Sequence, residues 1–596
     1  MAVASAAAPS APPIAIVRLW RGLPGAALAV VAVLVLAVLL PGQGYALNIL
    51  MQAATYAIAV TGLVIVLGYC GQISIAEAAF FGIGAYGLAL GTTDFALPFF
   101  AALAIGVALA GVLGAILGFG SLRLGGHYLA MVTISFQLIL TLVLTNWIGL
   151  THGPDGVTGI PRPVAGPLRL QGGNAYLGLC LVVLVLVVLF AWRLRTARLG
   201  RAMQAVRDNE LAASTCGIAV FRTKIIAFAL SAMLGGLGGG LFAGAFSYIS
   251  PDQFTFNDSI VLLTMALLGG VRSPFGALLG TVLLILLPEW LRFLRQIYLA
   301  VYGGAVILIM VFLPEGLSGQ LATWLRRDRA PMGAVPPLPL LAGRAPPGAA
   351  PILEIAGLAK HFGGLKALDG VDLAVRRGTV HALIGPNGSG KTTFINVVSG
   401  LYRPTAGRIA FAGADITRLS PHRRNHAGLA RTFQNIRVFR GMTVLENVMI
   451  GAERPGSEVA ARPAAAAARA LAALDFVGLR ADAGRMVATL PYGHQRYVEI
   501  ARGLAGDPQL LMLDEPAAGL NTTEKQDLAR LLLRLKGHGL TILIVDHDMT
   551  LVEQVADHIT VLNFGRRIAD GTPGQVLHEP DVIAAYLGEP RTDAAA

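Results

Sequence analysis

Long apolar segments fill the first 330 residues of this chain, and they decide what the chain can fold into. A helix needs about 20 mainly apolar residues to cross the hydrocarbon core of a bilayer. Ten segments approach that length, at approximate positions 24–41, 46–68, 73–92, 96–119, 127–149, 175–192, 225–247, 257–270, 274–290 and 297–314. The eighth is the shortest, and it is a candidate broken or re-entrant segment because Gly269 and Gly270 end it and Pro274 follows. The sequence therefore predicts a polytopic α-helical membrane domain of about 10 spans.

The composition excludes a purely soluble enzyme. Hydrophobic residues make up 55% of the chain and charged residues only 13%, whereas about a quarter of a soluble domain is charged. Residues 1–330 hold 18 Lys and Arg against 10 Asp and Glu, which leaves 28 and 24 of the totals of 46 and 34 for the rest. The net charge of +12 thus divides as +8 and +4, with the larger share where basic residues flank predicted spans. This basic balance does not predict nucleic-acid binding, and the three cysteines show neither a disulfide framework nor a metal-binding spacing.

Lys and Arg in the short loops predict the orientation, because cytoplasmic loops are enriched in them. A cytoplasmic N-terminus places most of these residues on the cytoplasmic side: Arg18, Arg21, Arg123, Arg193, Arg195, Arg198, Arg201, Arg207, Arg222, Lys224 and Arg272. Arg162, Arg169, Arg292 and Arg295 fall on the other side. We expect the first apolar run to be an uncleaved span, with a signal peptide cleaved after Gly44-Tyr45-Ala46 as the alternative.

Two features inside the apolar half call for an explanation. The glycines Gly235, Gly236, Gly238, Gly239 and Gly240 are expected to let spanning helices approach closely. Glu77 is an ionisable residue within a predicted span, where such a group is costly and usually faces a cavity or a partner. A position at the membrane interface, in contact with water, is the alternative for Glu77.

Residues 331–350, PMGAVPPLPLLAGRAPPGAA, separate two halves of different composition. Six prolines and few charges predict a semi-rigid extended tether. After it, predicted strands and helices alternate with dispersed charge, which is typical of a soluble α/β domain. We therefore expect a transmembrane domain at 1–330, a linker at 331–350 and an α/β domain at 351–596.

A phosphate-binding motif follows an apolar strand of the α/β half, at 380–384. Its residues fit G-x-x-x-x-G-K-[ST]: Gly385, Pro386, Asn387, Gly388, Ser389, Gly390, Lys391 and Thr392. In this motif the loop backbone and a helix N-terminus bind phosphate oxygens, Lys391 reaches the β and γ phosphates, and the Thr392 hydroxyl ligates Mg²⁺. Thr393 is counted with these residues, and the predicted ligands are ATP and Mg²⁺.

Two carboxylates end a second apolar strand, at 510–513. Asp514 is expected to hold Mg²⁺ directly or through water. Glu515 is placed to orient and deprotonate the attacking water as a general base. The alternative, two surface acids at the end of a strand, is disfavoured by the phosphate-binding motif in the same domain.

Five further motifs resemble one family, the P-loop ATPases known as ATP-binding cassette (ABC) ATPases. They are Leu490–Arg496 at the position of the signature, Arg431–Gln434 as the Q-loop, Ala518–Asn521 as the D-loop, His547 as the switch histidine and Phe362 as the aromatic residue that stacks on adenine. The resemblance implies that Gln434 senses the metal and the γ-phosphate, and that His547 contacts the γ-phosphate and holds the attacking water. It also implies that the signature segment with Tyr492 and Gly493 completes the ATP site of a second cassette across a dimer.

The polar loop from Arg193 to Lys224 lies inside the otherwise apolar half. Arg207–Ala213 is predicted to form an amphipathic surface helix. We expect this helix to dock on the ATPase rather than to be a solvated connector, because an ATPase attached to the chain must act on the membrane part at some point.

The membrane half also resembles a family, the permeases of branched-chain (hydrophobic) amino-acid importers. The similarity lies in Gly71–Ser74, Ala78–Tyr86, Tyr128–Thr133, Gly153–Gly156 and Gly200–Ile218, and in the cassette half in Leu513–Asn521 and Ala585–Glu589. The chain thus resembles a fusion of a permease with its partner ATPase. The resemblance implies ATP-driven import of branched-chain or related amino acids across a bacterial inner membrane, in contact with membrane lipid and with the ATPase in the cytoplasm.

The same resemblance implies partners, because one chain supplies one permease and one cassette. A periplasmic binding protein would deliver the ligand. Either a second copy of the chain or a separate permease and ATPase pair, which is the usual arrangement in this family, would complete the transporter. Importers of urea, amides or aromatic acids share this architecture and remain alternatives, as do an exporter half-transporter and a membrane-anchored regulatory ATPase.

Two positions depart from the general cassette pattern. Pro491 replaces the usual signature serine, which removes a hydroxyl donor to the facing γ-phosphate, and Asn521 replaces the D-loop acid. Asn at the latter position is common in the branched-chain family. We expect the site built with this signature to hydrolyse ATP less well than the site on this chain's own phosphate loop, so that Pro491→Ser raises ATPase activity in the assembled complex.

Overall fold

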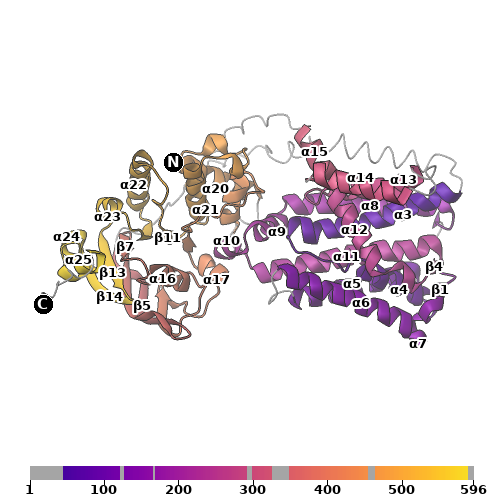
Figure 1. Ribbon diagram of the computed structural model, residues 1–596, viewed down its shortest axis with the longest axis horizontal. Helices are drawn as coiled ribbons and strands as arrows, with labels where there is room; N and C mark the ends of the chain where they lie inside the picture. The colour runs from indigo at the N-terminus through magenta and orange to yellow at the C-terminus, as the bar shows by residue number, and fades with distance from the viewer. Residues whose placement is uncertain are drawn as a thin grey trace, which may run out of the picture. The chain divides into compact units, whose positions relative to one another are not determined.

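The computed structural model describes residues 44–120, 126–165, 168–290, 298–313, 315–324, 348–453 and 463–587. The chain divides into two compact units (Figure 1). We call Met1–Arg195 with Lys224–Arg326 the helical unit, and Thr196–Thr223 with Arg327–Ala596 the α/β unit. The predicted span at 24–41 and most of the predicted linker lie outside the described residues. Strand β5 begins at Gly348, three residues before the expected start of the α/β domain.

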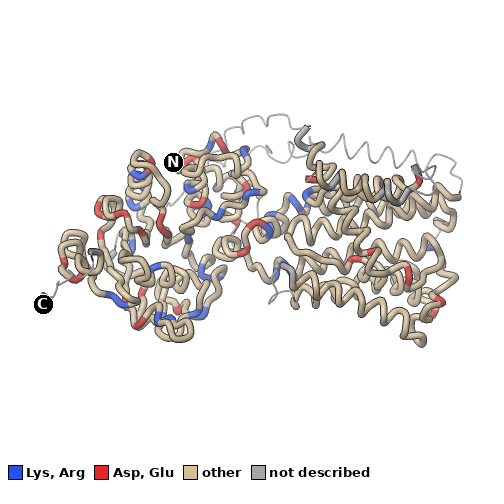
Figure 2. The backbone as a smooth tube through the Cα atoms, viewed as in Figure 1, with Lys and Arg blue, Asp and Glu red and all other residues tan. Residues whose placement is uncertain are grey.

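The helical unit consists of apolar helices that run alongside one another in Figure 1. They are α3 (Gly44–Leu63) with its π-helical continuation η2 (Val64–Tyr69), α4 (Glu77–Thr93), α5 (Phe99–Gly120), α6 (Gly126–Asn146), α7 (Ile148–Thr151), α8 (Gly173–Thr196), α11 (Val220–Phe246), α12 (Phe256–Gly269), α13 (Pro274–Trp290), α14 (Tyr298–Phe312) and α15 (Gly316–Trp324). Two short antiparallel strand pairs complete it, β1 (Val157–Thr158) with β4 (Tyr248–Ile249) and β2 (Val164–Ala165) with β3 (Leu168–Arg169). Lys, Arg, Asp and Glu are sparse along these helices and frequent in the α/β unit (Figure 2).

Five of the described helices are long and apolar enough to cross a membrane. They are Gly44–Tyr69, Phe99–Gly120, Tyr128–Asn146, Gly173–Thr196 and Val220–Phe246. A sixth span is formed if Pro251–Gly269 and Pro274–Glu289, which bend by 119° at their junction, count as one broken or re-entrant segment. The predicted number of about ten spans is therefore not confirmed. The reason is length, because α4 has 17 residues and α14 has 15.

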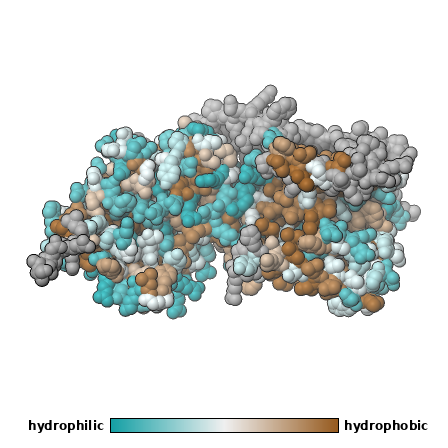
Figure 3. All heavy atoms as spheres, viewed as in Figure 1, coloured by the Kyte–Doolittle hydropathy of each residue, from teal (hydrophilic) through white to brown (hydrophobic). Residues whose placement is uncertain are grey.

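Helix α5 has an exposed apolar face. Ile105, Leu109, Val112 and Ile116 recur at helical spacing, and each is at least half exposed. Exposed apolar residues gather into a broad face on the helical unit in Figure 3, as expected of a surface in contact with lipid.

Glycines occupy the buried faces of these helices. A Cβ atom on Gly239 would lie 1.8 Å from the carbonyl oxygen of Phe81, and one on Gly84 would lie 1.9 Å from that of Gly236. Helices α4 and α11 therefore approach each other as closely as their backbones allow. The helix-packing interpretation of the glycine cluster is confirmed.

The α/β unit contains a six-stranded sheet in the order β10-β11-β12-β7-β13-β14 and a four-stranded sheet in the order β6-β5-β8-β9. The strands are β5 (Gly348–Phe362), β6 (Leu365–Arg377), β7 (Val380–Ile384), β8 (Ala406–Phe411), β9 (Ala414–Asp415), β10 (Leu429–Arg431), β11 (Leu510–Asp514), β12 (Thr541–Val545), β13 (His558–Asn563) and β14 (Arg566–Gly571). Strands β10, β11, β12, β7 and β13 are parallel neighbours, and β7, β11 and β12 are buried along their whole length. The predicted strands at 380–384 and 510–513 are confirmed.

Nine helices of the cassette sequence are described around these sheets. They are α16 (Lys391–Val398), α17 (Pro421–His426), α18 (Val444–Ala452), α20 (Pro463–Phe476), α21 (Tyr492–Ala505), α22 (Thr522–Gly537), α23 (Met549–Val555), α24 (Pro573–Val576) and α25 (Pro580–Leu587). Because β7, β11 and β12 are parallel, the loops that follow them meet at one edge of the sheet, where α/β folds bind ligands. The phosphate-binding motif, the two carboxylates and the switch histidine follow these three strands.

The polar loop between α8 and α11 forms two helices, α9 (Arg198–Asp208) and α10 (Glu210–Thr215). The prediction of one helix over Arg207–Ala213 is therefore wrong. Asn209 interrupts it with an extended backbone, and its side-chain oxygen accepts a hydrogen bond from the N–H of Ala212 at 2.9 Å. Asn is among the best N-cap residues, which explains why the second helix starts here.

Candidate functional site

The phosphate loop connects β7 to α16 through three glycines with positive φ. These are Gly385 at 150°, Gly388 at 81° and Gly390 at 101°. A Cβ on Gly385 would lie 2.1 Å from the carbonyl oxygen of Leu562, and one on Gly390 would lie 2.5 Å from that of Ala367. A larger residue would clash at either position. The two glycines therefore allow the loop backbone to pack closely at the N-terminus of α16, where anions bind.

Lys391 and the two threonines after it form the first turn of α16. The Lys391 Nζ donates to the carbonyl oxygens of Gly385 and Pro386 at 2.7 and 2.8 Å, so its ammonium lies inside the loop. Burial lowers the pKa of Lys391, while Glu515 and Asp514 act to raise it. Thr392 is exposed beside the loop and Thr393 is half-buried. The predicted phosphate-binding residues thus lie together on one loop and helix.

The carboxylate of Asp514, at the end of β11, has a hydrogen-bond partner for only one of its two oxygens among the described residues. Its Oδ2 accepts from Nη2 of Arg431 at 2.9 Å, whereas its Oδ1 is buried and has no hydrogen-bond partner among the described residues. Burial raises the pKa of Asp514, and Arg431 opposes this rise. A buried acceptor without a partner is rare and needs an explanation. A divalent cation would satisfy this oxygen, so the donor set fits Mg²⁺, which proteins bind through one or two carboxylates together with substrate phosphates.

Glu515 follows with a left-handed backbone, at φ 45°. Such a conformation is strained for a residue other than glycine and is held here by the Glu515 N–H, which donates to the carbonyl oxygen of Val545 at 2.7 Å. The Glu515 Oε2 accepts from Nε2 of Gln434 at 2.9 Å and lies 3.7 Å from Nδ1 of His547. The three predicted catalytic residues, Glu515, Gln434 and His547, are therefore brought together.

Asp546, which sequence reasoning missed, organises the loops around Glu515. This buried carboxylate accepts from the N–H groups of His547, Asp548 and Ala517 at 2.8, 3.0 and 3.2 Å. It therefore fixes the switch histidine relative to the D-loop. Its position directly before His547 is the only sequence signal for this role.

The remaining predicted nucleotide contacts lie at the surface of the α/β unit. Phe362 is 43% exposed, and its ring packs edge-on against Tyr402 with centroids 5.5 Å apart. Pro491 is the N-cap of α21, so Tyr492 and Gly493 occupy the first turn of that helix. Tyr492 is half exposed. The structure thus places the signature at a helix N-terminus, as expected, and Phe362 outside the cluster formed by Glu515, Gln434 and His547.

Asn521 has a structural role that accounts for its departure from the usual D-loop acid. Its side-chain oxygen accepts from the N–H of Glu524, and the Glu524 carboxylate accepts from the N–H of Asn521, both at 2.9 Å. This reciprocal pair is a capping box that starts α22.

The Thr196–Thr223 segment docks on the α/β unit, of which it is part. Arg201 forms a two-pronged, buried ion pair with Glu453, with the Nε to Oε2 distance at 3.2 Å. The Oδ2 of Asp208 accepts from the N–H of Gly441 at 2.7 Å, and Nη1 of Arg437 donates to Oδ1 of Asn209 at 3.4 Å. Docking was predicted because an ATPase attached to the chain must act on the membrane part, but the residues that receive the segment were not predicted.

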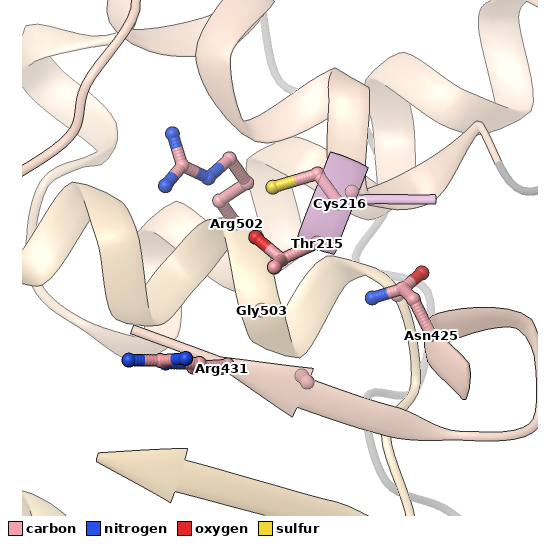
Figure 4. A pocket seen from close by; sticks show the side chains of 9 residues that line it. Thr215, Cys216, Asn425, Arg431, Arg502 and Gly503 are labelled. Atoms are coloured by element: carbon pink, nitrogen blue, oxygen red, sulfur yellow. The ribbon is translucent and has the colours of Figure 1, made fainter. Parts of the chain in front are cut away.

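A small pocket lies where the end of α10 meets β10, α17 and α21 (Figure 4). Its lining residues are Thr215, Cys216, Asn425, Ala430, Arg431, Gly451, Arg502, Gly503 and Gly506. His426 of α17 holds the segment beside the pocket, with its Nε2 2.9 Å from the carbonyl oxygen of Gly217.

A buried cluster on α21 connects the docked segment to the Q-loop. Glu499 accepts from the N–H of Arg437 at 2.9 Å and lies between Arg496 and Arg502. Nη2 of Arg496 donates to the carbonyl oxygen of Gln434 at 2.8 Å. Arg437, which contacts Asn209, and Gln434, which contacts Glu515, are thus both held by side chains of α21.

Glu77, at the start of α4, lies fully buried in the helical unit. The hydroxyl of Ser231 donates to its Oε2 at 3.1 Å, and its Oε1 has no hydrogen-bond partner among the described residues. This burial contradicts the alternative of a water-exposed position.

Known families match both halves of the chain. The family described as the permease component of a branched-chain amino acid transport system matches residues 45–313. The ABC transporter family matches residues 368–518, and a family described as branched-chain amino acid ATP-binding cassette transporter matches residues 566–591.

The chain covers almost the whole length of two relatives, both of them ATP-binding proteins. The high-affinity branched-chain amino acid transport ATP-binding protein BraF of Pseudomonas aeruginosa is 46% identical over 248 residues, which is 40% of this chain and 97% of the relative. The corresponding protein LivG of Escherichia coli K12 is 42% identical over 247 residues, 39% of this chain and 97% of the relative. The chain therefore belongs to the branched-chain amino acid ABC transporters, as a membrane permease component fused to an ATP-hydrolysing cassette.

Proposed function

We propose that this chain imports branched-chain amino acids across a bacterial inner membrane and that hydrolysis of ATP in its cassette drives the transport. The observation that supports coupling most strongly is the docking of Thr196–Thr223, a segment of the permease sequence, on the α/β unit through the buried Arg201–Glu453 pair. The two family matches to branched-chain transport systems support the class of substrate. On this proposal the permease covers residues 1–330 and the cassette 351–596, with the linker between them.

The proposed chemistry uses the residues that meet beyond β7, β11 and β12. The phosphate loop and Lys391 bind the β and γ phosphates, and Phe362 stacks on the adenine. Thr392, Asp514 and Gln434 would hold Mg²⁺, which would neutralise charge that develops on the phosphates. Glu515 accepts the proton of the attacking water, for which its contacts with Gln434 and His547 fix the carboxylate. His547 contacts the γ-phosphate and keeps the water in line.

The proposed assembly has two permeases and two cassettes. Tyr492 and Gly493 stand at the N-terminus of α21, which suits them to complete the ATP site of a facing cassette. A second copy of this chain or a separate permease and ATPase pair supplies the other half, and a periplasmic binding protein delivers the amino acid. The exposed apolar face of the helical unit is the surface toward membrane lipid.

The test is transport by the assembled complex, purified from its native membrane and reconstituted in liposomes with ATP on the cassette side. Uptake of labelled leucine, isoleucine, valine and urea, each offered with the binding protein, identifies the substrate. We expect ATP-dependent uptake of the three amino acids, which Glu515→Gln abolishes. Uptake of urea alone would assign the chain to the urea and amide importers. Efflux without a binding protein, or uptake that survives Glu515→Gln, would contradict the proposal.

A further inference from the structure

One buried arginine, Arg431 at the end of β10, contacts three parts of the nucleotide site. Its Nη2 donates to Oδ2 of Asp514 at 2.9 Å. Its Nη1 donates to Oδ1 of Asn396 at 2.7 Å and to Oγ of Ser399 at 2.8 Å, both at the end of the phosphate-loop helix α16. Its guanidinium lies 4.8 Å from the ring centroid of Phe433, the residue before Gln434. A single side chain of the Q-loop therefore joins the carboxylate of Asp514 to the phosphate-loop helix.

Arg431 is buried, so its guanidinium depends on protein groups for its hydrogen bonds. Arg431 and Asp514 are 6% and 2% exposed. Burial lowers the pKa of Arg431, and the Asp514 carboxylate beside it opposes this shift. A buried ionic group needs partners for its donors, and the loss of one partner leaves an uncompensated charge. The guanidinium is thus fixed by the carboxylate, the amide and the hydroxyl that it meets.

We propose that Arg431 is a positioning residue for the metal: by holding Oδ2 of Asp514 it leaves Oδ1 available to the metal and fixes that oxygen relative to α16. The inference rests on the proposed function of this site in binding Mg²⁺ and ATP. It accounts for the half-satisfied carboxylate of Asp514, whose second oxygen has no partner in the described part of the chain.

Arg431 also borders the pocket beneath the docked segment. Figure 4 shows it on β10, with its guanidinium directed along the strand and away from Asn425, while Thr215 and Cys216 form the opposite wall. The segment that belongs to the permease sequence therefore lies next to the residue that holds the metal-binding carboxylate.

The chemistry of this position requires arginine. A guanidinium is a planar fork with several donors in fixed directions, whereas lysine has one compact ammonium group. Lysine at position 431 would keep the positive charge beside Asp514 but could not also reach Asn396 and Ser399. Arg431→Lys therefore removes the geometry of the guanidinium while it keeps the positive charge.

Arg424, on α17, offers a matched control. It is 1% exposed, and its guanidinium donates to the carbonyl oxygens of Val397 and Val398, both at 2.7 Å. Arg424 thus supports the same end of α16 without a contact to Asp514. A substitution there disturbs the helix but leaves the carboxylate in place.

The test measures Mn²⁺ binding in place of Mg²⁺, by electron paramagnetic resonance, on the full chain with a non-hydrolysable ATP analogue. The variants are Arg431→Lys, Arg431→Met and the control Arg424→Lys, and each is also assayed for thermal stability and for nucleotide binding without metal. We expect Arg431→Lys to weaken Mn²⁺ binding about tenfold, as substitutions behind a metal ligand commonly do. Arg431→Met should weaken it at least as much. Metal-free nucleotide binding should stay within about twofold, and Arg424→Lys should lower only the thermal stability.

The sign of the change discriminates between positioning and charge. If Arg431 acted only as a nearby positive charge, its removal in Arg431→Met would tighten Mn²⁺ binding, because like charges repel. Tighter or unchanged binding in the Arg431 variants, or an equal loss in Arg424→Lys, would overturn the inference. If Arg431→Met fails to fold, Arg431→Lys and its control still decide the question. Absence of Mn²⁺ binding in the unmodified chain would instead contradict the proposed Mg–ATP site itself.

Discussion

Glu515 combines backbone strain with a fixed side chain. Its left-handed φ of 45° costs free energy, and the surrounding contacts with Val545, Gln434 and His547 hold it. Strain of this kind collects where a side chain must stand at a particular position and angle. These contacts hold the Glu515 side chain in one orientation, which suits its proposed role as a general base.

We expect Glu515→Gln to reduce ATP hydrolysis by a factor of about 10² to 10⁴, the usual contribution of a general base. Glutamine keeps the shape of the side chain, so ATP binding should persist. Both are measured on the full chain, hydrolysis by phosphate release and binding by a labelled nucleotide. The control is Glu553→Gln, which changes an exposed acid on α23. Equal hydrolysis by Glu515→Gln and the unmodified chain would exclude the base.

At the residue scale, the sequence predicted those side chains that belong to local motifs. The phosphate loop, Asp514 and Glu515 could be recognised because their chemistry depends on neighbours in the sequence. Glu453 and Asp546 could not, because each has a partner far along the chain, Arg201 for Glu453 and Ala517 for Asp546. Asn521 was predicted only as a departure, although Glu524 three residues on is the local signal of the capping box that starts α22.

At the scale of elements, the docked segment shows how a few contacts hold two short helices. Arg201 of α9 and Glu453 at the end of α18 are both buried, so their ion pair is shielded from water and salt. The predicted single helix failed because Asn209 serves better as an N-cap than as an interior helical residue. The break places Asp208 and Asn209 where they meet Gly441 and Arg437.

We expect Arg201→Met to destabilise this docking by about 3 to 5 kcal/mol, because Glu453 would be left buried without its partner. The exchanged pair, Arg201→Glu with Glu453→Arg, should recover part of that loss. A double-mutant cycle on the full chain measures it, with protection of α9 from hydrogen exchange as the readout. Equal protection of α9 in all variants would show that the pair does not hold the segment.

His381, the second residue of β7, is expected to make the stability of the α/β unit depend on pH. Its Nε2 lies 2.8 Å from the hydroxyl of Thr560, which itself donates to Asp570 and so accepts from the imidazole. Burial, the largest cause, and nearby His558 together lower the pKa of His381 from 6.5 to about 3, against the opposing effect of Asp570. The folded unit therefore keeps this imidazole neutral where the unfolded chain protonates it.

Because the pKa of His381 is lower in the folded chain than in the unfolded chain, its contribution to the stability of the α/β unit is present above about pH 6.5. This contribution is lost as pH falls toward 3. Each pH unit in this window costs about 1.4 kcal/mol. Urea unfolding of the full chain at pH 6.5 and pH 5 should therefore show a loss of about 2 kcal/mol that His381→Gln largely removes. His538→Gln, at an exposed histidine of the same unit, is the control. An unchanged pH dependence in His381→Gln would contradict this account.

At the scale of the whole molecule, one chain carries both a membrane unit and an ATPase. Composition indicates a change from apolar to charged sequence near residue 330, but it does not reveal that Thr196–Thr223 belongs to the α/β unit, because this depends on contacts. The number of spans could not be predicted, since apolar composition does not reveal where a helix is short, as in α4, or where two helices bend by 119°, as in α12 and α13. The order of strands in the sheet also depends on contacts that sequence patterns do not specify.

The central claim is that the docked Thr196–Thr223 segment couples ATP hydrolysis to import. The most direct measurement is the number of leucine molecules imported per ATP hydrolysed by the reconstituted complex, compared for the unmodified chain, Arg201→Glu and the exchanged pair Arg201→Glu with Glu453→Arg. We predict that Arg201→Glu lowers this ratio at least tenfold while hydrolysis continues, and that the exchanged pair restores much of it. An unchanged ratio in Arg201→Glu would contradict the claim.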